Sequence, residues 1–162
     1  MVEDSKPAQC TLVPDAPNAL TSDAGWDTHK NKHLLLDIIL RLQAAGVRTS
    51  IFIETDLDMI AMAKEIGTDR IELYTEEYAT QFALGNKNAV EPYARAAAYA
   101  DELGLEVNAG HDLNLDNLEW FSNHLPMLKE VSIGHALISD ALYLGLEETI
   151  GRYLACLEKQ FQ

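Results

Sequence analysis

Two similar stretches, Glu106-Val-Asn-Ala-Gly-His-Asp-Leu-Asn114 and Glu130-Val-Ser-Ile-Gly-His-Ala-Leu-Ile138, indicate how this chain folds. Each begins as a short strand, turns at a Gly-His pair and then opens a helix. Consecutive turns of this kind are typical of the phosphate site of a (β/α) barrel, where backbone N–H groups and a helix N-terminus face an anion. Because glycine lets the backbone approach a ligand and histidine titrates near neutral pH, the pair predicts an anion site suited to proton transfer.

The chain is strongly acidic. Its 162 residues carry 26 acidic and 12 basic side chains, a formal net charge of −14. This balance argues against nucleic acid or an anionic membrane as a partner, since both favour a basic protein face. It is compatible with small phosphorylated substrates, because backbone N–H dipoles can bind an anion on an acidic protein.

Cysteine usage and hydropathy indicate the compartment in which the chain is expected. The two cysteines, Cys10 and Cys156, lack the spacing of metal ligands, and no run of 18 apolar residues occurs. The first residues are polar and acidic, unlike a signal peptide. We therefore expect a reduced, cytoplasmic chain without a membrane span.

Strands and helices are predicted to alternate. Strands are expected at residues 10–13, 48–53, 69–74, 106–109 and 130–133, and helices at 33–45, 57–66, 76–82, 89–103, 115–124 and 139–160. Residues 14–32 have the composition of a long loop, and a loop of that length is usually functional. The alternation indicates an α/β fold, a parallel sheet covered by helices with both strand faces buried. Five strands form either an open sheet or part of a barrel, since a complete barrel has eight.

His111 follows the end of a strand, where catalytic groups gather in a parallel barrel. Taken alone, a Gly-His turn is more often structural, with a histidine that only caps the following helix or binds a carbonyl. The second turn, at Gly134 and His135, favours the functional interpretation. There the backbone N–H of His135, together with Gly134, suits a phosphate contact.

Glu72 lies between apolar residues of the strand at 69–74. A carboxylate buried there needs a partner or a chemical role. Either it pairs with Arg48 or Arg70, or it orients substrate and stabilises a cationic intermediate. Glu54, at the end of the preceding strand, is a weaker candidate of the same kind.

The polar loop Thr21-Ser-Asp-Ala-Gly-Trp-Asp27 offers hydroxyl groups to a sugar or phosphate oxygen. His29 and His33, just after it, have the i, i+4 spacing of two zinc ligands on one helix face. No third ligand or general base stands near them in the motif. We therefore interpret both histidines as surface residues.

Six stretches resemble motifs of the pyridoxine 5′-phosphate synthase family, in the family's order and spacing. They are Thr11-Leu-Val-Pro-Asp15, Thr21-Ser-Asp-Ala-Gly-Trp-Asp27, Arg48-Thr-Ser-Ile-Phe-Ile53, Arg70-Ile-Glu-Leu-Tyr-Thr75, Val107-Asn-Ala-Gly-His-Asp112 and Ser132-Ile-Gly-His-Ala-Leu-Ile138. The resemblance implies a TIM barrel that forms higher oligomers and needs no metal or organic cofactor. It also implies a reaction: 3-amino-2-oxopropyl phosphate condenses with 1-deoxy-D-xylulose 5-phosphate to give pyridoxine 5′-phosphate, phosphate and water.

The resemblance also implies roles for single residues. His111 matches the proton donor, and Glu72 matches a carboxylate that stabilises the transition state. Thr21 matches a contact to the deoxyxylulose phosphate. Three residues match the binding site of the amino-ketone phosphate: Asp112 through its backbone amide, Gly134 and His135. Some family members have glycine where this chain has Asp112, a change that an amide contact tolerates.

The family has three strands ahead of the one at residues 10–13. They carry an Asn-x-Asp-His motif, a His, an Arg and a Glu, and that His and Glu are the two general bases. None of these has a counterpart here, so we expect residues 1–162 to be a single domain, the C-terminal part of a TIM barrel lacking the first three βα units.

Such a chain is expected to be inactive alone. It would need a complementing N-terminal segment, or it would self-associate as a homo-oligomer. The alternative is a non-catalytic phosphate-binding or assembly module derived from the same barrel.

Overall fold

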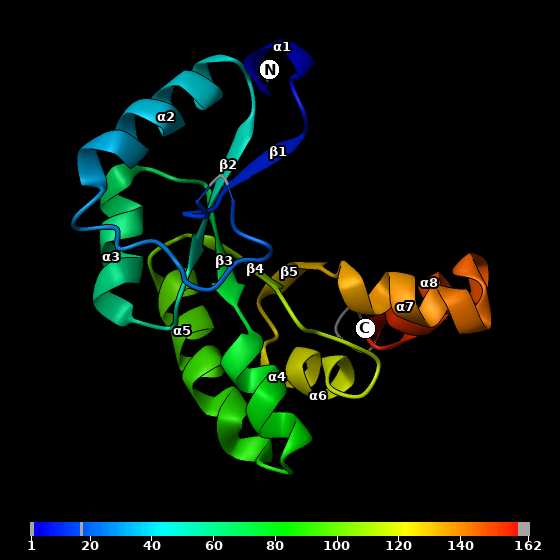
Figure 1. The fold of residues 1–162 in the computed structure, drawn as a ribbon. Helices are drawn as coiled ribbons and strands as arrows, with labels where there is room; N and C mark the ends of the chain where they lie inside the picture. The colour runs from blue at the N-terminus through cyan, green and yellow to red at the C-terminus, as the bar shows by residue number, and fades with distance from the viewer. Residues whose placement is uncertain (1, 17, 159–162) are drawn as a thin grey trace.

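The computed structural model describes residues 2–16 and 18–158, and its centre is one parallel sheet (Figure 1). Its strands are β1 (Gln9–Leu12), β2 (Arg48–Ile53), β3 (Arg70–Tyr74), β4 (Glu106–Gly110) and β5 (Leu128–Ser132). Each strand pairs in parallel with the next one along the chain, so the order is β1-β2-β3-β4-β5. This is the strand order in the wall of a (β/α)8 barrel, and the expected partial barrel is confirmed.

Helices connect the strands and cover one face of the sheet. They are α1 (Val2–Ser5), α2 (Lys32–Ala44), α3 (Leu57–Ile66), α4 (Glu76–Ala83), α5 (Glu91–Glu102), α6 (Leu118–His124), α7 (His135–Leu144) and α8 (Leu146–Ala155), with a 3-10 turn η1 (Lys87–Val90) ahead of α5. In Figure 1, α2 and α3 lie along one side of the sheet, and the α7–α8 pair extends beyond β5. No helix in the described part of the chain is long and apolar enough to cross a membrane.

The C-terminal helix differs from the sequence prediction. One helix was expected at 139–160, but the structure has α7 and α8, and residues 159 and 160 lie outside the described residues. The break is at Gly145, whose φ of 84° ends α7 in a conformation that favours glycine. Moreover, α7 begins at His135, four residues earlier than predicted, because the Gly-His turn itself opens the helix.

The two faces of the sheet differ in chemistry. Alternate residues of the central strands are apolar, fully buried and packed with the helices in one core: Ile51, Ile53, Ile71, Leu73, Val107 and Ala109. Since side chains alternate along a strand, the intervening residues face the other way. They are mainly polar, and Ser50, Arg70, Glu72 and Asn108 are among them. Both faces of the central strands are buried as expected. The face turned away from the helices, here called the inner face, carries polar groups.

Charged side chains join the strands where they begin. The Arg70 guanidinium lies 2.5 Å from a carboxylate oxygen of Glu106 and 2.8 Å from one of Glu130. It also donates to the amide oxygen of Asn108 at 3.1 Å. Arg48 reaches the same Glu130 carboxylate at 3.1 Å. Because a buried arginine needs such partners, this network fills the amino end of the inner face.

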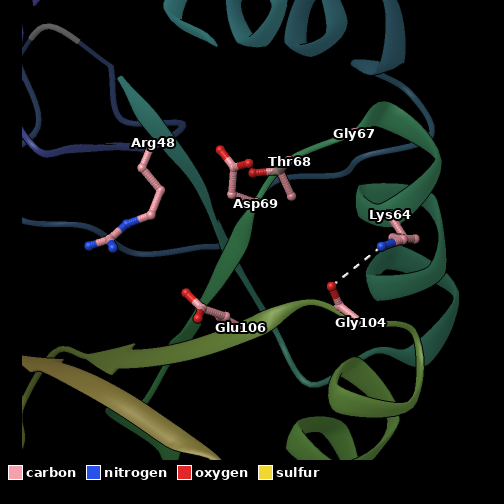
Figure 2. Close-up of a pocket in the computed structure, with 7 residues that line it drawn as sticks. All are labelled: Arg48, Lys64, Gly67, Thr68, Asp69, Gly104 and Glu106. Carbon is pink, nitrogen blue, oxygen red and sulfur yellow. Dashed lines mark hydrogen bonds between the residues drawn. The ribbon is translucent and has the colours of Figure 1, made fainter. Parts of the chain in front are cut away.

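A pocket opens at this end of the sheet (Figure 2). It is lined by Arg48, Lys64, Gly67, Thr68, Asp69, Gly104 and Glu106. In the close-up, the ammonium group of Lys64 donates to the carbonyl oxygen of Gly104 at 3.4 Å. Catalytic groups of a barrel gather at the carboxyl ends of the strands, which lie at the opposite end of the sheet from this pocket.

Candidate functional site

The carboxyl ends of the strands border an open cavity of about 920 Å³. Strands β1, β2, β3 and β5, the turns after β4 and β5, and the loop after β1 all contribute to its lining. The lining includes the six residues to which the family resemblance assigns a role: Thr21, Glu72, His111, Asp112, Gly134 and His135. The fold therefore brings the two Gly-His turns and the buried carboxylate to one place, of a size that accepts small-molecule ligands.

The first turn holds an uncommon backbone conformation. His111 and Asp112 have φ values of 90° and 57°, in the left-handed region. Non-glycine residues held in such regions cost about 1–3 kcal/mol each, so surrounding contacts must fix them. The buried hydroxyl of Thr75 contacts the carbonyl oxygens of Gly110 and His111, and the amide of Asn117 donates to the carbonyl of Asp112 at 3.1 Å. The turn is thereby held in place beside the cavity.

The His111 ring is held through both nitrogens. Its Nδ1 lies 2.9 Å from a carboxylate oxygen of Asp112, and its Nε2 lies 2.8 Å from the Thr21 hydroxyl. An ionised carboxylate only accepts hydrogen bonds, so Nδ1 carries a proton and donates to Asp112. Nε2 then accepts from Thr21 when the ring is neutral and donates to it when the ring is protonated. Nε2 is therefore the ring nitrogen that can act as either donor or acceptor.

Tyr74 packs against the same ring. The centroids of Tyr74 and His111 are 4.9 Å apart, with the rings at 80° to each other, and the phenol donates to the carbonyl of Ser22 at 3.3 Å. Burial raises the pKa of Tyr74, and the nearby carboxylates of Glu76 and Asp112 raise it further. The phenol therefore stays protonated and ties the loop after β1 to the end of β3.

Glu72 lies on the inner face of β3 and is 7% exposed. One carboxylate oxygen, Oε2, accepts a hydrogen bond from the Thr11 hydroxyl of β1 at 2.9 Å. The suggested ion pair with Arg48 or Arg70 is wrong, because those guanidinium groups pair with Glu130. Glu72 instead lines the cavity, so its charge is available to a bound ligand.

The second turn supplies a helix N-terminus. Gly134 is the residue before α7, His135 is its first residue, and both are exposed at the cavity. The first N–H groups of a helix have no partner within the helix and carry a partial positive charge. This end of α7 is suited to an anion.

Other sequence candidates lie outside the cavity. His29 and His33 are exposed, as predicted. The Glu54 carboxylate accepts a hydrogen bond from the backbone N–H of Gly25 at 3.2 Å and so fixes the loop after β1.

Three contacts at the site were missed from the sequence: those of Thr11, of the Tyr74 ring and of the Asp112 carboxylate. The polar inner face, which recurs at every second strand residue, is a signal that could have identified Thr11. The other two depend on how the turn after β4 is placed.

Comparison with known proteins is consistent with this geometry. A family model described as "Pyridoxal phosphate biosynthesis protein PdxJ" matches residues 1–159. The relative from Flavobacterium johnsoniae, named pyridoxine 5′-phosphate synthase, is 58% identical over 158 residues, which are 98% of this chain and 67% of the relative. A relative of the same name from Porphyromonas gingivalis is 59% identical over 153 residues, 94% of this chain and 64% of its own length. The chain thus spans about two thirds of the length of these relatives.

Proposed function

The chain belongs to the PdxJ family, and we propose that its cavity is the proton-donating and phosphate-binding part of a pyridoxine 5′-phosphate synthase site. The observation that carries the proposal is the convergence of both Gly-His turns and Glu72 on one cavity, with the His111 ring fixed between Thr21 and Asp112. The substrates proposed are 3-amino-2-oxopropyl phosphate and 1-deoxy-D-xylulose 5-phosphate, and the products are pyridoxine 5′-phosphate, phosphate and water.

His111 is the proposed general acid. In its protonated form it gives the Nε2 proton to a departing oxygen of the substrate, which takes the place of the Thr21 hydroxyl. The Asp112 carboxylate at Nδ1 holds the ring orientation and stabilises the imidazolium, as the acidic member of a Ser-His-Asp triad does. The side chain of Asp112 therefore gains a proposed role beside that of its backbone amide.

The family resemblance assigns the two phosphate groups, and the hydrogen-bond donors at the cavity suit that assignment. The amino-ketone phosphate binds at the N-terminus of α7, at Gly134 and His135, and at the backbone amide of Asp112. The deoxyxylulose phosphate contacts Thr21. Glu72, a buried carboxylate beside the cavity, stabilises positive charge that develops on the condensing nitrogen.

The proposal includes a partner for the open sheet. In the described residues β1 pairs only with β2, and β5 only with β4, so each has a free edge. The α7–α8 pair also exposes large apolar side chains, among them Leu142, Tyr143 and Leu146. Free edges and apolar surface of this kind favour pairing with another chain. A complementing N-terminal segment of three βα units, carrying the two general bases, or a second copy in a homo-oligomer would cover them.

An assay of the purified 162-residue chain with both substrates, beside size-exclusion chromatography of the same sample, tests the proposal. We expect no product from the chain alone. We also expect it to elute at an apparent mass above 18.0 kDa, the mass of one copy. Adding the N-terminal segment of the Flavobacterium johnsoniae relative should restore formation of pyridoxine 5′-phosphate.

Two outcomes would contradict this. Turnover by a stable monomer would place the bases within this chain, with Glu54 and Glu72 as the first candidates. Phosphate binding without turnover in the complemented protein would favour a non-catalytic phosphate-binding module.

A further inference from the structure

The Glu72 carboxylate is confined from two sides. On one side its Oε2 accepts the hydrogen bond from Thr11, which comes from a strand 61 residues earlier in the chain. On the other side its Oε1 lies against the backbone of Gly110 in β4. A Cβ added at Gly110 would stand 2.6 Å from that oxygen, closer than non-bonded atoms approach. The carboxylate therefore occupies the space that a side chain at Gly110 would fill.

Backbone conformation does not require glycine at position 110. Gly110 is absent from the glycines with positive φ, so its conformation is open to other residues. The added Cβ would also lie 3.0 Å from the Cβ of Ser132 in β5. Thr11 of β1 and Gly110 of β4 thus flank the Glu72 carboxylate of β3.

We propose that Thr11 is a positioning residue for Glu72: its hydroxyl holds the carboxylate in place beside Gly110, at the lining of the cavity. The inference rests on the proposed function, because it assigns Thr11 an effect on turnover through Glu72. A carboxylate held before the reaction begins stabilises developing charge better than one that must reorient. Threonine suits the task because its β-branched side chain is stiff on a strand, and so the donor direction is defined.

Variants of Thr11 in the chain complemented with the N-terminal segment test the role in turnover. Thr11→Val removes the hydrogen-bond donor and keeps the shape of the side chain. We expect kcat to fall about tenfold with KM unchanged, because the free energy of a hydrogen bond to a charged group corresponds to a rate change of about that size. Thr11→Ser should restore kcat. In a Glu72→Gln background, Thr11→Val should cost nothing further. Thr80→Val is the matched control, because Thr80 lines the same cavity but its hydroxyl donates to Glu76.

A second measurement needs no turnover. The side-chain carboxylate 13C resonance of Glu72 in the 162-residue chain, assigned by its loss in Glu72→Gln, should move in Thr11→Val and stay in Thr11→Ser and Thr80→Val. An unmoved resonance in Thr11→Val overturns the contact. A moved resonance with unchanged kcat overturns the positioning role and leaves the proposed function intact. Full turnover by Glu72→Gln overturns both the role of Glu72 and this inference. Lack of product from the unsubstituted complemented protein rejects the proposed function itself, and the resonance then decides the contact alone.

Discussion

The hydroxyl of Thr21 lies 2.8 Å from Nε2 of His111, although 90 residues separate them in the sequence. The contact exists because the loop after β1 folds back over the strand ends. There the indole N–H of Trp26 donates to the carbonyl of Leu12 at 3.0 Å, and the backbone N–H of Trp26 donates to the carbonyl of Phe52 at 2.9 Å. A long loop anchored in this way to a rigid sheet is a common carrier of binding residues.

The two Gly-His turns are predicted to bind one anion. Titration of the 15N-labelled chain with inorganic phosphate should move the backbone amide resonances of Asp112, Gly134 and His135 along one binding curve, because these groups border the same cavity. The amides of Gly67 and Gly104, in the pocket of Figure 2, serve as the control and should not follow that curve. Separate curves for the two turns would contradict a shared site.

Replacing His111 is predicted to separate binding from turnover. In the complemented protein, His111→Asn should keep phosphate binding and lower kcat by about 10²–10⁴-fold, the usual contribution of a general acid. His29→Asn and His33→Asn are the matched controls, and kcat should not change, since both side chains are exposed away from the cavity. Full turnover by His111→Asn would assign the donor role to another group.

Two glycine-to-alanine changes are predicted to shift stability in opposite directions. A Cβ at Gly25 would stand 2.6 Å from the backbone of Ile53 and Glu54, so Gly25→Ala should lower the free energy of unfolding by about 1–3 kcal/mol. Gly151 lies inside α8 with nothing within 4 Å of its added Cβ, so Gly151→Ala should raise it by about 0.5–1 kcal/mol. Urea unfolding of both variants measures these changes. An unchanged free energy of unfolding in Gly25→Ala would mean that the loop is not packed on β2 as described.

Asp69 is predicted to make stability depend on acid. Burial alone would raise its pKa, but hydrogen bonds from the Thr49 amide at 2.7 Å and hydroxyl at 2.8 Å, with one from Gln43, lower it below the ordinary 3.8. A carboxyl whose pKa is lowered on folding stabilises the fold above its unfolded pKa, and the benefit is lost as pH falls through the folded value. Asp69→Asn should therefore be less stable than the parent at pH 7, with the difference shrinking below about pH 3.8. A difference that stays constant between pH 7 and pH 3 in urea unfolding would refute this.

The sequence by itself determined the order of the elements and placed most of them to within a few residues. The prediction for β2 (Arg48–Ile53) and α3 (Leu57–Ile66) was confirmed residue for residue, because apolar periodicity and the capping residues Asp56 and Gly67 act locally. The Gly-His turns were also readable, since a strand that stops at a glycine and opens a helix needs only neighbouring residues. The parallel sheet followed from the alternation of these elements.

Only the tertiary structure decided which side chains meet. Thr11 and Glu72 come from strands that are not neighbours in the sheet, and Thr21 reaches His111 across a loop. Arg48 and Arg70 likewise form ion pairs with a residue far along the chain, Glu130, that the sequence did not predict as their partner. Such pairings depend on the register and curvature of the whole sheet, which bring inner-face residues of several strands together, and no local pattern encodes them.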